Sequence, residues 1–347
     1  MARIIYGVHG TGHGHAIRAL AIARMFPEHE FHFVSHDTGL DLLRGAYPAT
    51  ACPNPATVVT GHRVRAAATL ASLMRFQRRR ADHLRTVRDC FSRFQPDAAL
   101  TDYECLVPAV ARELGVPCLS LDHQHILPLC GSCVPLARYP EYLATVWAIR
   151  RLFSGASVHV ATSFFPAPRP PSDGSLHVVP PLLRQKVLEH GSREGEHVLA
   201  YQGYSTFERF VPFLRRIGRP VLVYGLERTG SEGNLHFKPN AEEEFLRDLA
   251  GCRYVICGGG HSLISEALYY GKPVLSFPIR RAIEQWLNAW HVERLGYGRM
   301  LASFYPSPGF IRDFESKSDR YRERIRGALF YGNEVVQQRI QSFLGVI

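Results

Sequence analysis

Apolar and polar positions follow two rhythms along this chain, with short apolar runs of strand length and longer stretches of helical periodicity. Strand-length runs lie at residues 3–8, 30–35, 97–101, 117–121 and 157–161 in the first half, and at 197–202, 220–225, 253–257 and 272–277 in the second. Helical stretches separate most of these runs, which is the pattern of βαβ units in parallel sheets. We therefore predict an α/β fold in which each half forms its own doubly wound sheet.

A proline-rich stretch separates the two sets of predicted strands. It reads FFPAPRPPSDGSLHVVPPLLR at residues 164–184, and we interpret it as a linker because its prolines disfavour both a helix and a central strand. A length of 347 residues also favours two domains over one. We expect a first domain over residues 1–182 and a second over residues 183–347, with a last helical stretch at residues 321–343 that packs back on the first domain.

Residues 67–94 are predicted to form one long amphipathic helix that is rich in arginine. Its apolar side chains share one side: Leu70, Leu73, Leu84, Val87, Phe91 and Phe94. One interpretation is a solvated surface helix with ion pairs at i,i+4 spacing: Arg78–Asp82 and Arg85–Asp89. The other interpretation is contact with an anionic membrane surface or with a phosphate-bearing partner.

Composition and charge favour a cytoplasmic protein with an anionic partner. The formal net charge is +10 at pH 7, which favours a phosphorylated substrate, an acidic membrane face or nucleic acid. No apolar run approaches the roughly 18 residues of a membrane span, and we expect neither a signal peptide nor an anchor. The eight cysteines lie mostly in apolar runs, as buried free thiols do in a reducing compartment. Peripheral attachment to the inner face of the membrane stays open as an alternative.

The stretch GGGHSLISEALYYGKPVLSFPI begins at Gly258, directly after a predicted strand. Its glycines let backbone amides approach a ligand, and a helix that begins near His261 would direct its N–H groups to the same space, an arrangement that suits a diphosphate. Glu266, one turn further on, could accept hydrogen bonds from the hydroxyls of a ribose. The alternative is a tight strand-to-helix turn with a buried glutamate that bonds to the backbone. After the next strand, Glu284 and Gln285 begin another helix, where an acid and an amide can bind sugar hydroxyls.

The loop after the first strand reads GTGHGHAIRALAIA and carries two candidate histidines. A dinucleotide-binding fingerprint requires its third glycine three residues after the second, where this chain has His15, so we expect no nicotinamide or flavin. An imidazole that titrates near neutral pH is suited to take the proton of an attacking hydroxyl, and His15 is our candidate for this base. His13 is expected only to contact phosphate.

Taken together, these motifs resemble the GT-B nucleotide-sugar glycosyltransferases, which include the UDP-glucuronosyltransferases and the GlcNAc transferase of peptidoglycan synthesis. The branch in question has GTGxGHxxRAxALA near the start and GGxxxLSEALxxGKPVL near the end, and the stretches DAALTDYE, LSLDHQH, VPPLLR, VLVYGL and LHFKP lie between them in the expected order. The resemblance covers essentially the full length. It implies two Rossmann-like doubly wound domains that face each other across a cleft, the second holding the donor and the first the acceptor. The chain departs from the pattern at His261 and in the doubled histidine of the first loop.

The resemblance implies an inverting hexosyltransferase that moves a sugar from a nucleotide-diphosphate donor, UDP-linked by preference, to a hydroxyl acceptor. His15 would be the base, and Asp102, at the end of a strand, would orient His15 or serve as the base itself. The residues expected to bind the donor are Gly12, His13, Gly203, Phe237, Lys238, Gly259, Gly260, His261, Ser262, Glu266, Glu284 and Gln285. We expect no cofactor and no metal ion, because helix dipoles and cations would neutralise the leaving diphosphate.

The acceptor side is less well defined by the sequence. Glu104, His123 and His125 are expected to line it. Cys130 and Cys133 follow the two histidines, so a zinc site stays open, although a single CxxC lacks the second pair of a zinc ribbon. A lipid at an anionic membrane surface, reached through residues 67–94, is our first hypothesis for the acceptor, and nucleic acid is the weaker one.

Two other classes of protein remain compatible with these residues. A UDP-sugar 2-epimerase would share the fold and the donor site but act without a separate acceptor. A non-catalytic module that binds nucleotide sugars or nucleic acid would need none of the catalytic groups. The sequence predicts no oligomeric state.

Overall fold

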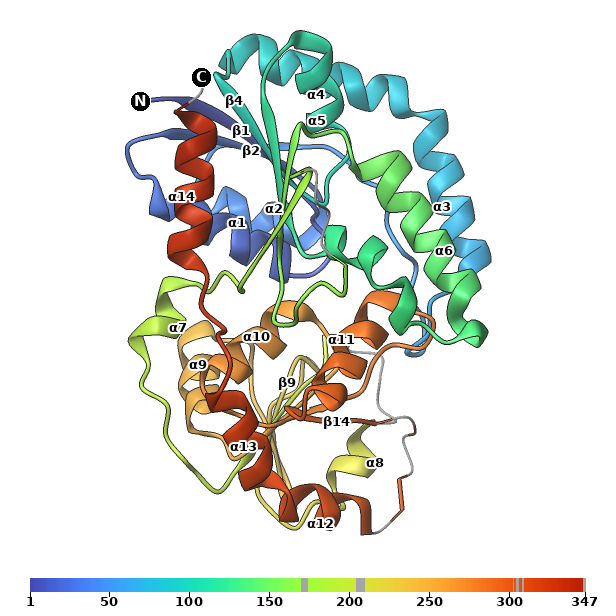
Figure 1. The fold of residues 1–347 in the computed structure, drawn as a ribbon, viewed down its shortest axis with the longest axis vertical. Helices are drawn as coiled ribbons and strands as arrows, with labels where there is room; N and C mark the ends of the chain where they lie inside the picture. Colours follow the sequence, from blue (N-terminus) through green and yellow to red (C-terminus); the bar gives the residue numbers. More distant parts are fainter. Residues whose placement is uncertain (170–173, 204–209, 302, 304–305, 308, 346–347) are drawn as a thin grey trace. The chain divides into compact units, whose positions relative to one another are not determined.

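The computed structural model describes the chain except for residues 170–173, 204–209, 302, 304–305, 308 and 346–347 (Figure 1). It divides into two compact units. Unit 1 consists of Met1–Val58, Arg65–Arg184 and Gly332–Ile347, and unit 2 consists of Val59–Val64 and Gln185–Tyr331. Each unit is built on one largely parallel sheet, which confirms the predicted α/β class.

Unit 1 contains a parallel sheet in the order β3-β2-β1-β4-β5-β6-β7. Its strands are β1 Arg3–Val8, β2 Glu30–Ser35, β3 Ala49–Ala51, β4 Ala98–Asp102, β5 Cys118–Asp122, β6 Val158–Thr162 and β7 Leu176–Val179. The strand order reverses between β1 and β4. Ligands of open α/β sheets bind at such a switch point, beyond the carboxyl ends of the strands.

The helices of unit 1 cover both faces of its sheet. They are α1 Gly14–Met25, α2 Asp37–Arg44, α3 Ala66–Arg78, α4 Arg80–Phe94, α5 Val107–Leu114, α6 Tyr139–Ala148 and α14 Asn333–Leu344. Because side chains alternate along a strand, Ile4 and Tyr6 pack in one core with α1 and α14, whereas Ile5 packs in the other with α4 and α5. Short 3-10 turns at Gln124–Leu129, Gly131–Cys133 and Leu136–Arg138 and a π turn at Ile149–Phe153 complete the unit.

Unit 2 has the strand order β10-β11-β9-β8-β12-β13-β14, parallel except for the β10–β11 pair. Its strands are β8 Val198–Tyr201, β9 Val221–Tyr224, β10 Gly230–Glu232, β11 Leu235–Phe237, β12 Val255–Cys257, β13 Val274–Ser276 and β14 Gly298–Met300. Its helices are α7 Gln185–Glu189, α8 Val211–Leu214, α9 Glu242–Gly251, α10 His261–Tyr269, α11 Ile283–Arg294, α12 Gly309–Ser316 and α13 Ser318–Arg326. Here the switch point lies between β8 and β12.

Two helix predictions were wrong in the same way. The expected helix at residues 67–94 is two helices, α3 and α4, because the chain leaves helical geometry at Arg79 (φ −104°, ψ 7°). The expected helix at residues 321–343 is also interrupted, since α13 ends at Arg326 in unit 2 and α14 begins at Asn333 in unit 1. The predicted partner of Arg85 differs as well, because Arg85 contacts Asp82 at 3.4 Å.

The return of the chain into unit 1 is fixed by the side chain of Asn333. Its Oδ1 accepts from the backbone N–H of Leu183 at 2.8 Å, and its Nδ2 donates to the carbonyl of the same residue at 2.7 Å. Val336 and Ile340 then enter the core beside α1, where Figure 1 draws α14 along unit 1.

The proline-rich stretch at residues 164–184 is more than a linker, because it also contains β7, an edge strand of the first sheet.

One short segment of the first half belongs to unit 2. Arg63 forms a parallel bridge with Arg280, and the ring of His62 stacks on that of Phe277 with 4.7 Å between centroids. Burial lowers the pKa of His62 to about 4.

All eight cysteines are free. Within the described part of the chain, no helix combines the length and the apolar character needed to cross a bilayer.

Candidate active site

The loop between β1 and α1 is shaped by two glycines. A Cβ at Gly10 would overlap the backbone carbonyl of His36, so only glycine fits where the loop passes α2. Gly12 has φ +79°, in the left-handed region that glycine adopts without strain. The chain then enters α1 with His13 exposed as the N-cap and His15 in the first turn.

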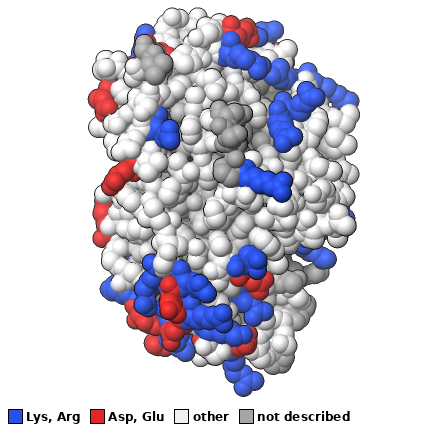
Figure 2. Space-filling model, in the orientation of Figure 1, with Lys and Arg blue, Asp and Glu red and all other residues white. Residues whose placement is uncertain are grey.

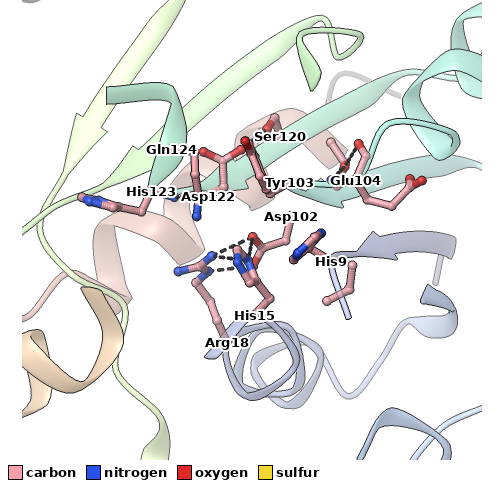
Figure 3. A network of polar contacts seen from close by, with 12 residues as sticks. His9, His15, Arg18, Asp102, Tyr103, Glu104, Ser120, Asp122, His123 and Gln124 are labelled. Carbon is pink, nitrogen blue, oxygen red and sulfur yellow. Dashed lines mark hydrogen bonds and ion pairs between the residues drawn. The ribbon is translucent and has the colours of Figure 1, made fainter. Parts of the chain in front are cut away.

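At the switch point of unit 1, α1 meets the last residue of β4 (Figure 3). His15 Nδ1 lies 2.7 Å from Asp102 Oδ1, which places these two predicted residues in direct contact. Arg18 binds the same carboxylate with two donors, Nη2 to Oδ1 at 2.6 Å and Nε to Oδ2 at 2.7 Å. Asp102 has no exposed side-chain surface, whereas His15 retains 16% of its own.

The hydrogen-bond partners determine which nitrogen of His15 carries the proton. A carboxylate only accepts, so the Nδ1 proton of His15 points to Asp102 and the lone pair of Nε2 is left for another proton. Arg18 Nη2 also lies 3.1 Å from Nδ1, but two donors cannot bond to each other, so this contact is an approach without a hydrogen bond. Burial acts to lower the pKa of Arg18, and the charge and hydrogen bonds of Asp102 outweigh it and raise that pKa overall.

Arg18 is a site residue to which sequence reasoning assigned no role. It stands in the motif GTGHGHAIRALAIA three residues after His15, a spacing that places both side chains on one face of a helix. The signal that could have identified it was therefore present in the sequence. A buried arginine on that face requires an anionic partner, and the strand that ends in Asp102 provides one.

A second layer of aromatic side chains surrounds His15. The ring of His9 lies 5.2 Å from that of His15, and the ring of Tyr103 lies nearly parallel to it at 6.2 Å. Asn54 Nδ2 contacts His9 Nδ1 at 2.8 Å and donates to the carbonyl of Tyr103 at 2.9 Å. Burial, with the neighbouring His15 and His36, lowers the pKa of His9 well below its usual value. The surroundings of His15 are therefore rich in neutral rings.

Glu104, which the sequence placed on the acceptor side, has a buried carboxylate that binds backbone N–H groups. This residue is 2% exposed, and its carboxylate accepts the backbone N–H groups of Leu106 at 2.7 Å and Val107 at 2.8 Å. It therefore satisfies N–H groups at the start of α5, and burial raises its pKa to about 7. A Cβ at Gly7 would overlap this carboxylate, which shows how closely β1 packs against it.

His123 and His125 are both buried and turn in different directions. His123 Nδ1 lies 2.8 Å from the carbonyl of Thr162, and His125 Nδ1 lies 2.6 Å from Asp122 Oδ2. Cys130 is fully buried, with its thiol toward the carbonyl of Ile126. Among the residues that the structure describes, no group of three or more His, Cys, Asp or Glu side chains is arranged to hold a metal ion.

The glycine loop of unit 2 follows β12 at the second switch point. Gly259 has φ +101°, and a Cβ there would lie 2.8 Å from the carbonyl oxygen of Gln285. Asn288 Nδ2 donates to the carbonyl of Gly259 at 3.0 Å, and Gln285 Oε1 accepts from the N–H of Ile279 at 3.0 Å. Gly260 is exposed, with open space where a Cβ would stand. The structure thus brings the glycine loop and the start of α11 together, and the donor-binding role of these residues stays a prediction.

The first turn of α10 contains two further predicted residues. His261 is 6% exposed and accepts the hydroxyl of Ser265 on its carbonyl at 2.9 Å, whereas Ser262 is half-buried. The first N–H groups of a helix have no partner within it, so α10 directs a row of donors toward the loop. Glu266 is 5% exposed, and Glu284 is half-buried.

The remaining predicted donor residues differ in their surroundings. Gly203 is exposed just beyond β8, at the carboxyl edge of the sheet. Phe237 ends β11, is 4% exposed and carries the guanidinium of Arg228 over its ring at 4.2 Å. Lys238 already pairs with Glu244 at 2.8 Å and Asp248 at 2.7 Å. Its charge is therefore compensated inside unit 2, which leaves it a weaker candidate for holding an anionic donor than the sequence implied.

Each unit has a largely parallel sheet with a glycine-shaped loop at its switch point, and comparison with solved structures shows that this is the GT-B glycosyltransferase fold. CalG4, the calicheamicin glycosyltransferase, aligns with a TM-score of 0.67 and 16% identity over 99% of this chain and 98% of its own. MurG from Acinetobacter baumannii aligns with a TM-score of 0.61 and 17% identity over 99% and 100%. A UDP-glucosyltransferase from Polygonum tinctorium aligns with a TM-score of 0.68 and 14% identity over 99% and 98%. At these identities the likeness establishes the fold.

Sequence comparison gives the family. The family described as glycosyl transferase family 1 matches residues 2–317, and the chain belongs to it. An uncharacterized glycosyltransferase of Methanosarcina mazei is 39% identical over 74 residues, 21% of this chain and 20% of that protein. One of Methanosarcina acetivorans is 56% identical over 73 residues, 20% of this chain and 19% of that protein. The matched segment thus spans about a fifth of the length of these relatives.

Replacing Arg18 with methionine should lower the free energy of unfolding by about 3–5 kcal/mol, because the Asp102 carboxylate then stays buried with only His15 as a side-chain partner. Urea-induced unfolding measures this loss. Adding Asp102→Asn to the same variant should recover part of it, since the uncompensated charge is removed.

Arg24→Met provides the matched control for this experiment. Arg24 is exposed in the last turn of the same helix, and its loss should cost no more than about 1 kcal/mol. An Arg18 variant as stable as this control would contradict the inferred compensation of Asp102.

Proposed function

We propose that the protein transfers a hexosyl group from a UDP-linked sugar to a hydroxyl acceptor, with inversion at the anomeric carbon and without a bound metal ion. The observation that carries the proposal is the 2.7 Å contact between His15 and Asp102 at a switch point, in a chain that belongs to a glycosyltransferase family. UDP is the preferred nucleotide because structural neighbours include a UDP-glucosyltransferase from Polygonum tinctorium and a Medicago truncatula protein complexed with UDP-glucose.

In the proposed reaction, His15 Nε2 takes the proton of the acceptor hydroxyl as the hydroxyl oxygen attacks the anomeric carbon. The bond between that carbon and the diphosphate oxygen breaks, and the diphosphate leaves with the electron pair. One displacement of this kind inverts the anomeric centre. Asp102 fixes the tautomer of His15 and stabilises the imidazolium that forms.

The leaving diphosphate gains negative charge, which must be met by donors that are already oriented. The N–H groups at the start of α10 and the positive end of its dipole offer such donors beside the open space at Gly260. In this proposal Glu266 binds the ribose, and Glu284 with Gln285 binds the donor sugar. These two groups belong to the helices that flank the glycine loop.

Release of free UDP from UDP-glucose, UDP-GlcNAc or UDP-galactose without acceptor is the first experiment, because transferases of this kind hydrolyse their donor slowly. We expect one donor to give release above the rate without enzyme. Conversion of a UDP-sugar into its 2-epimer without UDP release would indicate the epimerase class instead. No turnover of any donor would favour a binding module.

His15→Ala should lower the rate of UDP release by about 10²–10⁴-fold while the dissociation constant of the donor stays within about twofold, because general-base catalysis contributes in the transition state. His13→Ala is the control on the same loop, and it should leave turnover nearly unchanged. Equal turnover in the His15 variant and the wild type would remove His15 from its role as base.

Glu266→Ala should raise the dissociation constant of the donor by about tenfold or more, because a charged hydrogen bond to the ribose contributes about 1.5–3 kcal/mol. Titration of UDP followed by calorimetry measures the effect. Thermal unfolding of the variant serves as the control, since Glu266 is buried. An unchanged affinity in a folded variant would reject the ribose assignment.

For the acceptor, we propose a lipid at an anionic membrane surface. Not all of residues 67–94 could contact a membrane, because the Val87 and Phe91 side chains of α4 are buried in unit 1. Large apolar side chains are exposed on α3, with Leu70 58% and Met74 50% exposed. A second exposed set lies on α6, which the sequence did not single out.

The exposed side chains of α6 resemble those of a helix that lies at a membrane interface, with apolar residues next to arginines. Leu143 is 56% and Trp147 is 54% exposed, and their i,i+4 spacing places them on one face. Arg150 and Arg151 follow directly and are exposed. In Figure 2 the surface over α6 is mostly uncharged, with Lys or Arg side chains beside it. Apolar side chains flanked by arginine favour the boundary between acyl chains and anionic headgroups.

Trp147→Ser should weaken binding to vesicles of phosphatidylglycerol and phosphatidylcholine by about fivefold or more in a flotation assay, because it removes the largest apolar contact. Leu114→Ser is the matched control, since Leu114 is 51% exposed in the same unit but at the end of α5. Binding should also fall with rising salt and with pure phosphatidylcholine. Wild-type binding that is equal on both vesicle types, or absent, would contradict the membrane proposal.

A further inference from the structure

A cavity of about 540 Å³ lies in unit 2, at the opposite edge of the sheet from the glycine loop. It is lined by the end of α11, the start of β14 and one side of α13. Gly298, the first residue of β14, pairs with the first residue of β13, so the cavity is at the amino ends of these strands. Arg294 and Glu284 stand at the two ends of α11, about 15 Å apart along its axis. The cavity is therefore separate from the proposed donor site.

Cationic side chains dominate the lining. They are Arg294, Arg299, Lys317, Arg320 and Arg324, and the one carboxylate that lines the cavity with them is Glu293. Arg299 contacts Glu293 at 2.8 Å and Asp313 at 3.2 Å, and Lys317 contacts the same aspartate. In the part of the chain that the structure describes, the other three arginines have no carboxylate within ion-pair distance. Figure 2 shows Lys and Arg gathered around fewer Asp and Glu where α13 lies.

Arg294, Arg320 and Arg324 are exposed, so water solvates them, but an anion that enters the hollow would be attracted by all three charges at once. Guanidinium groups offer paired donors whose geometry matches two oxygens of one phosphate, and Arg294, Arg320 and Arg324 present three of them. The volume lies within the range of about 300–1,000 Å³ that is usual for small-molecule sites. The hydroxyl-bearing ring of Tyr321 at the same wall adds a polar group that could fix the orientation of a ligand.

We propose that this cavity binds a small phosphate-bearing anion, at a site distinct from the one that would hold the donor diphosphate. This inference goes beyond the proposed transferase activity and does not depend on it. Nucleic acid and anionic lipid are different occupants, and the experiment below separates them from the small anion.

The probe is inorganic pyrophosphate, titrated into the full-length protein by calorimetry at about 150 mM salt to screen weak surface attraction. The test variant is Arg294→Gln/Arg320→Gln/Arg324→Gln, which keeps polar side chains and removes three charges. We expect it to bind pyrophosphate at least tenfold more weakly than the wild type at this site. Arg326→Gln is the matched control, because Arg326 is exposed on α13 but does not line the cavity, and it should bind like the wild type.

Saturating UDP distinguishes the two sites. Pyrophosphate binding that persists with UDP and is lost in the triple variant supports the cavity, whatever the outcome for the transferase reaction. Pyrophosphate binding that UDP abolishes and the triple variant retains places the anion at the donor loop and overturns the proposal. Wild-type protein that binds no pyrophosphate also overturns it. Binding of single-stranded DNA or anionic vesicles that is tighter than that of pyrophosphate and lost in the triple variant would show a macromolecular occupant instead.

Discussion

The candidate site depends on one buried charge, the carboxylate of Asp102. A carboxylate without exposed surface is stable only when hydrogen bonds and an opposite charge replace its hydration. Arg18 provides the charge and two of the bonds, and His15 provides a third. Because these two residues share one face of α1, the same contacts also fix how that helix is rotated against β4. The orientation of the imidazole therefore follows from the electrostatics of the core of unit 1.

The burial of Asp102 beside Arg18 also bears on whether Asp102 or His15 acts as the base. Arg18 stays charged under all ordinary conditions, so the carboxylate it holds remains an acceptor. A buried Asp102 that accepts three hydrogen bonds is less available to take a proton from an acceptor hydroxyl than Nε2 of His15, whose side chain retains 16% exposure. The geometry thus favours His15 over Asp102 as the base, a choice that the sequence left open. In the proposed reaction, the arginine of the motif would act through Asp102, whose charge it compensates.

Some helices and strands could be predicted from the sequence and others could not, depending on whether local side-chain patterns or contacts with distant residues determine them. The strands at residues 3–8 and 30–35 were predicted with the bounds of β1 and β2, because their apolar runs are buried on both sides. The break at Arg79 gave no local signal, since the residues around it are ordinary helix formers. β7 was missed because an edge strand tolerates flanking prolines. The placement of Val59–Val64 in unit 2 rests on backbone pairing with Arg280, which no side-chain pattern records.

For the site, proximity was harder to predict than residue type. The pairing of His15 with Asp102 followed from the rule that loops at a switch point converge, so the sequence could anticipate it. Glu104 stands only two residues from Asp102, yet its carboxylate turns to the N–H groups at the start of α5. A residue two positions beyond the end of a strand, as Glu104 is, follows the turn that leaves the strand, and that turn was not predictable from composition. A motif therefore locates a site more securely than it assigns each polar residue within it.

The net charge illustrates the same limit at the scale of the whole chain. A value of +10 predicted an anionic partner, and the arginine-rich residues 67–94 were the candidate surface, but Arg85 and Arg88 there pair with Asp82 and Glu113. In unit 2, three arginines without a carboxylate partner among the described residues (Arg294, Arg320 and Arg324) line a cavity at the carboxyl end of α11. Charge that is spread along a sequence becomes concentrated only where helix ends and strand ends converge, which the sum of charges cannot express. The net charge alone therefore does not distinguish a protein that binds an anionic membrane surface from one that binds a small phosphate-bearing anion.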